Sequence, residues 1–213
     1  MLALHTYWRS SAAYRVRIAL NVKGIEARQI ACNLVSGEQG GSAYRQLNPQ
    51  GLVPALLDGE QVIGQSLAII EYLEDIHPLP ALLPAEPLAR ARVRSIALAI
   101  ACDIHPLNNL RVLNHLRDEL AQSKEQIRAW YQHWIATGFA ALEEEVARSS
   151  ETGRYCCDDT LSLADVCLVP QVYNAERWQC DLAPYPRLRA INEHLCSLAA
   201  FAAARPEAQP DAR

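Results

Sequence analysis

Two hydrophobic periods alternate along the first third of the chain. Apolar and polar residues alternate over Leu2–Tyr7, which predicts a strand, whereas apolar residues from Ala12 to Leu20 recur at helical spacing, which predicts a helix. Lys23-Gly24 ends that helix, because a cation suits the last turn and glycine suits the left-handed cap. A second strand is expected around Ala27–Cys32. This order of strand, helix and strand is typical of an α/β domain.

The pattern then predicts a loop, a hairpin and a third apolar segment. Ser36–Ser42 is polar and glycine-rich, as loops are, and Asn48–Gly51 is expected to form a turn. Ala55–Leu57 and Val62–Ile63 are short apolar runs joined by Asp-Gly, which indicates a hairpin. Ser66 is then expected to cap a helix that ends near residue 75. The predicted order is βαβ, a short helix or loop, and ββα.

A proline-rich segment divides this half from a helical one. His77–Pro87 contains four prolines, and no later segment alternates cleanly, so we expect a linker there. The predicted domains are residues 1–80, which are α/β, and residues 88–213, which are all-helical. Pro106 is expected to bend the first long helix. The helices expected in the second domain are Leu88–Leu120, Lys124–Arg148, Leu163–Asn174 and Tyr185–Phe201.

Composition narrows the class of protein. With 213 residues, of which 50% are hydrophobic and 21% charged, the chain can bury one large core or two smaller ones. A net charge of -4 argues against general nucleic-acid binding, which depends on basic patches. No apolar run is long enough for a signal peptide or a membrane span. Seven scattered cysteines indicate reduced thiols, and the histidines form no metal-ligand cluster. We therefore expect a soluble, cytoplasmic protein without a metal, and with neither nucleic acid nor membrane as partner.

Candidate chemistry lies where the first strand meets the first helix. Ser10 and Ser11 stand at this join, and two interpretations remain open. A serine there can simply cap the helix, because its hydroxyl oxygen accepts a hydrogen bond from an orphan N–H group, worth about 1 kcal/mol over alanine. Hydroxyls and N–H groups converging at a helix N-terminus can also stabilise an anion such as a thiolate.

Several motifs follow one another in order along nearly the whole chain, namely Arg9–Leu20, Val53-Pro54, Gln65–Leu73, Asp103–Arg111, Leu163–Asp165, Val169–Val172 and Leu182–Pro186. With these motifs the chain resembles the zeta class of cytosolic glutathione transferases. One departure is that Ala12 replaces the cysteine of the class signature, which removes a site for oxidation and bears on rate and side activities.

The resemblance implies a fold, a cofactor and an activity. The fold is a thioredoxin-like α/β domain followed by an all-α domain, and the protein is a homodimer formed across the first domain of one chain and the helical domain of the other. Glutathione is a cofactor that is not consumed, and the substrate is a small maleyl dianion. The activity is cis–trans isomerisation of maleylacetoacetate to fumarylacetoacetate in aromatic amino-acid catabolism. Alternatives are maleylpyruvate isomerisation, transfer of glutathione to electrophiles such as α-haloacids, and a non-catalytic binding module.

The resemblance also implies roles for individual residues. Ser10 and Ser11 orient and ionise the glutathione thiol, and Arg9 stabilises the negative charge that develops on the substrate. Arg9, Arg111 and Arg177 bind the substrate through their forked guanidinium groups. The residues implied to bind glutathione are Gln39, Gln50, Val53, Gln65, Ser66, His105 and Asn109.

Three features of this set are specific expectations. Val53-Pro54 is expected to be cis, so that the Val53 backbone can pair with the cysteinyl part of glutathione. Ser66 is expected to lie at a helix N-terminus that favours the γ-glutamyl carboxylate. His105 and Asn109, four residues apart, are expected to share one face of the long helix. The structural alternatives are a trans turn proline, simple capping, a packed histidine and solvated surface arginines.

Overall fold

The computed structural model describes residues 1–148, 153–157 and 159–212, which form two compact units. Unit 1 comprises Met1–Ala81 and Ser197–Arg213, and unit 2 comprises Leu82–Cys196. The C-terminal residues, which we expected in the helical domain, thus belong to unit 1. The reason is packing, because helix α9 (Ala199–Ala204) lies against α1 (Ser11–Lys23) and buries Phe201 completely. Residue 213 lies outside the described residues.

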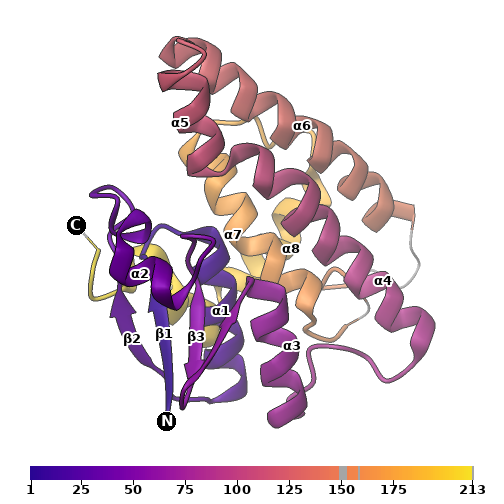
Figure 1. The fold of residues 1–213 in the computed structure, drawn as a ribbon. Helices are drawn as coiled ribbons and strands as arrows, with labels where there is room; N and C mark the ends of the chain where they lie inside the picture. Colours follow the sequence, from indigo (N-terminus) through magenta and orange to yellow (C-terminus); the bar gives the residue numbers. More distant parts are fainter. Residues whose placement is uncertain (149–152, 158, 213) are drawn as a thin grey trace. The chain divides into compact units, whose positions relative to one another are not determined.

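Unit 1 is built on a four-stranded mixed sheet. The strand order is β2-β1-β3-β4, with β1 parallel to β2, antiparallel pairing elsewhere, and Leu4 opposite Leu56 in the centre. Helices α1 and α3 pack against each other at one face, and α2 lies at the other (Figure 1). The strands and remaining helices are β1 (Leu2–Thr6), β2 (Arg28–Ala31), β3 (Ala55–Asp58), β4 (Gln61–Gly64), α2 (Ser42–Leu47), α3 (Ser66–Ile76) and the 3-10 helices η1 (Glu38–Gly40) and η4 (Pro206–Ala208).

The thioredoxin-like expectation for the first domain is confirmed, with one local difference. Gly24 caps α1 with a left-handed φ of 64°, as its sequence position predicts. Ser66, however, is the first residue of α3 and does not cap it. The cap position belongs to Gln65, whose side chain makes no capping hydrogen bond, so the hydroxyl of Ser66 is available for another partner.

Unit 2 is helical, and α7 (Leu163–Arg177) lies between α4 (Pro87–Leu98) and α8 (Pro186–Cys196) (Figure 1). The expected Tyr185–Phe201 helix is divided after Cys196, where the chain passes to unit 1. Helix α6 (Lys124–Arg148) matches its predicted bounds and packs against α8. No helix among the described residues has the length and hydropathy required to cross a membrane.

The long helix expected over Leu88–Leu120 is interrupted rather than bent. After α4 the backbone forms a π-helical segment, η2 (Ala99–Ile104), and then a 3-10 helix, η3 (His105–Asn108), before α5 (Leu110–Asp118) begins. Pro106 lacks the N–H group that an α-helix needs there. Asn109 then starts a new helix, because it has an extended backbone and its side chain accepts from the Arg111 N–H.

Candidate functional site

The turn between β1 and α1 holds the first group of candidate residues. Ser10 is the N-cap of α1, and its Oγ accepts a hydrogen bond from the Ala13 N–H at 3.2 Å, which confirms the capping interpretation. Capping uses only the oxygen as an acceptor, so the hydroxyl proton can still be donated to an anion. Ser11 is the first helical residue and is 5% exposed. Capping and anion stabilisation are therefore compatible at this turn.

Arg9 is held over two aromatic rings beside these serines. Its guanidinium carbon lies 4.8 Å from the ring centre of Trp8, within the range of a cation–π interaction. Its Nη2 also donates to the Tyr7 hydroxyl at 3.1 Å. The positive charge is thereby fixed one residue before the capping serine.

Two glutamines far apart in sequence meet at the start of α3. Gln65 Nε2 donates to Gln50 Oε1 at 2.8 Å, and both side chains are exposed. Gln65 has a φ of 65°, a left-handed conformation that non-glycine residues seldom adopt. Strain of this kind costs about 1–3 kcal/mol and concentrates at functional sites. The structure thus brings together two residues that the sequence assigned to one ligand.

Ser66 follows directly and has a buried cationic partner. Arg15, on α1, is 1% exposed, and its Nη1 donates to Ser66 Oγ at 3.3 Å. A guanidinium group therefore lies against the N-terminus of α3, where the helix dipole already favours an anion. Sequence reasoning did not single out Arg15. Arg15 could have been found from its position in the apolar stretch that predicts α1, because a charged residue on a buried helix face needs a partner.

Gln39 lies close to the Asn48–Gly51 turn. A Cβ atom placed on Gly51 would stand 2.9 Å from the Gln39 carbonyl oxygen, and Gly51 has a φ of 62°. The side-chain Oε1 of Gln39 is buried and has no hydrogen-bond partner among the described residues. The sequence predicts the turn at Asn48–Gly51 but not the close approach of Gly51 to Gln39.

Val53 is 8% exposed and packs against Tyr7, Cys32 and Tyr44. The Val53–Pro54 peptide bond is cis, as the family resemblance implied. Burial and, to a smaller extent, the charge of Glu38 together raise the pKa of the neighbouring Cys32 thiol to about 11. Cys32 is thus a poor nucleophile near neutral pH.

The candidate residues of unit 2 do not share a helix face. His105 begins η3 and Asn109 caps α5, so the expected pairing four residues apart along one helix is wrong. The 3-10 turn has a tighter rotation per residue than an α-helix, and the extended Asn109 backbone breaks the register. Helix α6 fixes this segment, because Trp130 Nε1 donates to the Leu107 carbonyl at 2.9 Å.

Tyr131 of α6 connects this segment to Arg177. The Tyr131 carbonyl accepts from Asn108 Nδ2 at 3.4 Å, and its ring stacks on Trp178 at a centroid distance of 4.2 Å. Burial raises the pKa of Tyr131, and the nearby Arg177 charge partly opposes this. Arg177 is the last residue of α7 and, like Arg111 at the start of α5, is exposed. Both guanidinium groups are therefore accessible on unit 2.

The cysteine thiols and the possible metal ligands add no further candidate chemistry among the described residues. All seven cysteines lie within the described residues, none of them is in a disulfide, and Cys102 alone is exposed. Burial raises the pKa of the Cys180 thiol to about 11, partly countered by Arg128. The described residues contain no group of three or more His, Cys, Asp or Glu side chains arranged to hold a metal ion.

Known proteins resemble this chain in sequence and in fold. Residues 4–81 match the family model for the glutathione S-transferase N-terminal domain. The chain is 51% identical over 213 residues to a probable maleylacetoacetate isomerase of Vibrio cholerae, covering 99% of this chain and 98% of the relative. A maleylpyruvate isomerase, described as a bacterial glutathione S-transferase of the zeta class, is 48% identical with a TM-score of 0.97, covering 99% of this chain and 100% of that one. A maleylacetoacetate isomerase from Methylobacterium extorquens AM1, solved with bound malonate and glutathione, is 40% identical with a TM-score of 0.96 and 99% coverage of both chains.

Proposed function

Because the chain belongs to the glutathione S-transferase family and to its zeta class, we propose that it isomerises maleylacetoacetate to fumarylacetoacetate. The enzyme uses glutathione as its cofactor and acts in aromatic amino-acid catabolism. The observation that carries the proposal is the polar arrangement of unit 1, in which a serine-capped helix begins beside Arg9 and a linked pair of glutamines precedes Ser66. These groups suit a thiol and a γ-glutamyl carboxylate.

The residues of unit 1 fit glutathione. Ser66 lies at the N-terminus of an 11-residue helix, where N–H groups and the dipole favour a carboxylate, and Arg15 adds a positive charge behind it. The amides of Gln65 and Gln50 are exposed beside this end. The orphaned Oε1 of Gln39 offers a buried acceptor for an N–H group of the tripeptide backbone. Val53 is assigned to the cysteinyl backbone. The family resemblance also assigns His105 and Asn109 of unit 2 to glutathione.

Bound glutathione supplies a thiolate that adds reversibly to the cis double bond and permits rotation, so the cofactor is not consumed. Ser10 and Ser11, together with the N–H groups at the start of α1, favour negative charge on sulfur and hold it in place. This lowers the pKa of the thiol toward the working pH. No cysteine of the chain is needed, which is consistent with Ala12 at the signature position.

The arginines are assigned to the substrate. Arg9 stabilises the negative charge that develops during the reaction, the role that oxyanion-stabilising donors have in other enzymes. Arg111 and Arg177 bind the carboxylates, because a guanidinium group can form two parallel hydrogen bonds to a carboxylate. A dianionic maleyl substrate thus has one cation for the reacting end and two for the carboxylates.

Maleylpyruvate is the second candidate substrate. It carries the same maleyl group on a shorter keto-acid arm, and the similarity to a maleylpyruvate isomerase favours it specifically. The discriminating experiment follows both substrates by ultraviolet absorbance with glutathione far below the substrate concentration. We expect many turnovers per glutathione, unchanged total thiol at the end, and the higher kcat/KM for maleylacetoacetate.

One control and three possible outcomes separate the alternatives. S-methylglutathione, which lacks the free thiol, should support no turnover. Loss of one thiol per product would indicate conjugation, as with α-haloacids, and would contradict the isomerase. A higher kcat/KM for maleylpyruvate would transfer the proposal to the second substrate. Retention on a glutathione column without turnover of either substrate would favour a binding module.

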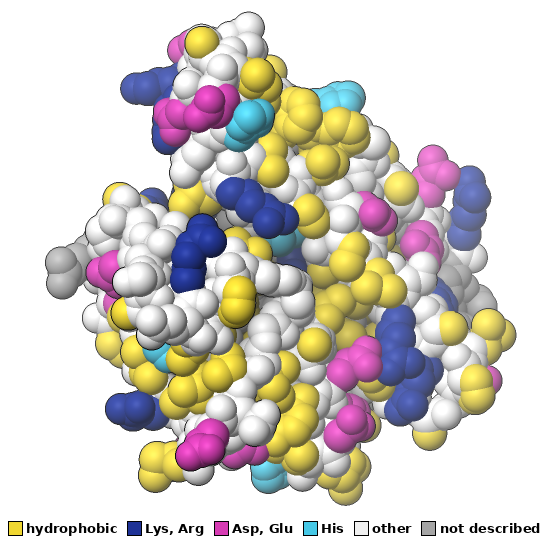
Figure 2. All heavy atoms as spheres, viewed as in Figure 1, with side chains coloured by type: hydrophobic (Ala, Val, Ile, Leu, Met, Phe, Trp, Pro, Cys, Tyr) yellow, Lys and Arg dark blue, Asp and Glu magenta, His cyan; other side chains and the backbone are white. Residues whose placement is uncertain are grey.

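The proposal includes a cytoplasmic homodimer. Large apolar side chains are exposed on both units, namely Val62 and Ile76 on unit 1 and Leu88 and Leu98 on unit 2. Figure 2 shows apolar side chains gathered over α4 and α6. Contact between the first domain of one chain and the helical domain of the other would cover such positions. Sedimentation at micromolar concentration tests this, since a monomer would contradict the assembly. The absence of disulfides among the described residues is consistent with a reducing compartment.

A further inference from the structure

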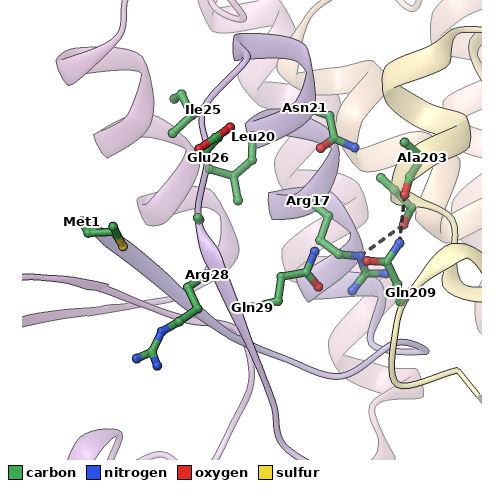
Figure 3. A pocket seen from close by; sticks show the side chains of 12 residues that line it. Met1, Arg17, Leu20, Asn21, Ile25, Glu26, Arg28, Gln29, Ala203 and Gln209 are labelled. Carbon is green, nitrogen blue, oxygen red and sulfur yellow. Dashed lines mark hydrogen bonds between the residues drawn. The ribbon is translucent and has the colours of Figure 1, made fainter.

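The C-terminal segment, residues 197–212, packs against α1 through α9 and is also held by hydrogen bonds from side chains to the carbonyl groups of the segment. Asn21 Nδ2 donates to the Ala200 carbonyl at 2.9 Å, and Arg17 Nε donates to the Ala204 carbonyl at 3.2 Å. Within the segment, Gln209 Nε2 donates to the carbonyls of Ala203 and Arg205 at 3.0 and 2.8 Å. Figure 3 shows the Arg17 and Gln209 side chains converging on this backbone. These bonds fix the path of the segment.

One side of the segment borders an open hollow of about 610 Å³. The hollow lies between α1, β2 and the segment, and Asn21, Gln29 and Gln209 are among the residues that line it (Figure 3). The packing of α9 against α1 and the hydrogen bonds to the carbonyl groups of the segment together hold it in place.

The far end of this segment reaches the β1–α1 turn. Asp211 Oδ2 accepts a hydrogen bond from the Trp8 N–H at 3.0 Å. The Trp8 carbonyl accepts from Arg17 Nη2 at 3.0 Å, and the Tyr7 carbonyl accepts from Arg17 Nη1 at 3.3 Å. The N–H and the C=O of Trp8 are thus each fixed by a charged side chain. Bonds of this kind are about twice as strong as those between neutral groups.

We propose that Asp211 is a positioning residue for the catalytic turn. It acts through Trp8, whose ring stacks on Arg9 and whose backbone leads directly to Ser10. Without the carboxylate, the Trp8 N–H loses its partner, and Arg17 alone fixes the residue. The turn can then shift, and Arg9 and Ser10 shift with it. This inference rests on the proposed function, since it needs Arg9 and Ser10 to be catalytic.

The test compares two replacements of Asp211 with a control on the same segment. Asp211→Ala removes the acceptor, whereas Asp211→Asn keeps an oxygen at the same place. Glu207→Ala removes a carboxylate from η4 of this segment. Kinetics are measured at a temperature where circular dichroism shows every variant folded. Hydrogen exchange of the peptide that contains Trp8 reports on the turn directly.

We expect Asp211→Ala to lower kcat and kcat/KM together by about tenfold, because small misplacements of catalytic groups cost this much or more. The KM for glutathione should stay within about twofold, since the tripeptide-binding residues are not moved. Exchange at Trp8 should accelerate. Asp211→Asn should recover most of the rate, and Glu207→Ala should match the unaltered protein.

Three results would overturn the inference. These are unchanged kinetics in Asp211→Ala, an equal loss in Glu207→Ala, and a loss in Asp211→Ala without faster exchange at Trp8. Failure of the proposed function is distinguishable, because then the unaltered protein would not turn over either maleyl substrate. Failure of the positioning role alone leaves the unaltered protein active.

Discussion

Replacement of Gly51 by alanine isolates the contact between the Asn48–Gly51 turn and Gln39. Two costs are expected. An alanine at a φ of 62° costs about 1–2 kcal/mol, because Cβ approaches the following carbonyl. The new Cβ also stands 2.9 Å from the Gln39 carbonyl oxygen, a backbone atom that cannot rotate away. Overpacking of this kind costs about 1–3 kcal/mol. The free energy of unfolding should therefore fall by about 2–5 kcal/mol.

Gly59→Ala is the matched control. Gly59 has a φ of 58°, so it carries the same backbone cost, but a Cβ there meets no atom within 4 Å. Urea unfolding should show that Gly51→Ala loses about 1–3 kcal/mol more than Gly59→Ala. The KM for glutathione should rise about tenfold in Gly51→Ala alone, because relief of the overlap moves Gln39 or Gln50. Equal stability losses and equal glutathione KM values in the two variants would refute the assignment of this turn to the cofactor site.

Three further predictions concern charge, pH and thiols. Replacing Arg9, Arg111 or Arg177 by alanine should lower kcat/KM for the dianionic substrate by about 10- to 100-fold while sparing glutathione binding. The Arg9 variant should lose kcat, whereas the other two variants should mainly show a raised KM. Collapse of glutathione affinity in each variant would show that these arginines belong to the tripeptide site. Burial, helped by the charge of Arg28, lowers the pKa of His5 below its ordinary value of 6.5, so the folded state binds fewer protons just below that pH. The free energy of unfolding should thus fall on acidification below about pH 6.5, less steeply in His5→Gln, and identical pH profiles would disprove this. Replacement of all seven cysteines should leave most activity intact, and loss of activity in a folded variant would show that a protein thiol takes part.

The fold of the first domain was predictable because its signals are local. Strand alternation, the Lys23-Gly24 helix end and the Asp-Gly hairpin each specify a neighbouring backbone conformation, and each is present. The helical half was less predictable. Apolar spacing continues through 88–120, but it does not reveal the π and 3-10 segments, which depend on how α6 holds the chain around Pro106. Nor does it reveal that α9 leaves the helical unit for α1.

The candidate site, like the fold, was predictable from the sequence only in part. Ser10 and Ser66 could be placed at helix starts from their spacing, and the family resemblance supplied the remaining roles. Contacts between distant positions could not be derived, because no periodicity encodes them. The Gln50–Gln65 bond, the Arg15–Ser66 bond and the bond from Trp8 to Asp211 each join segments separated by at least 15 residues. A single sequence does not show which distant residue a glutamine, arginine or aspartate side chain will contact.

The division of the chain into units has a consequence for its biosynthesis. Unit 2 is one continuous stretch, so it can fold as soon as it has been translated, whereas unit 1 needs residues from both ends of the sequence. At 5–20 residues per second, roughly ten seconds separate the emergence of residue 81 from that of residue 197. During this interval α1 lacks its α9 neighbour and Trp8 lacks Asp211. The nascent chain therefore holds unit 1 in an unfinished state, and the β1–α1 turn that we propose to be catalytic is completed only when translation has delivered residue 211.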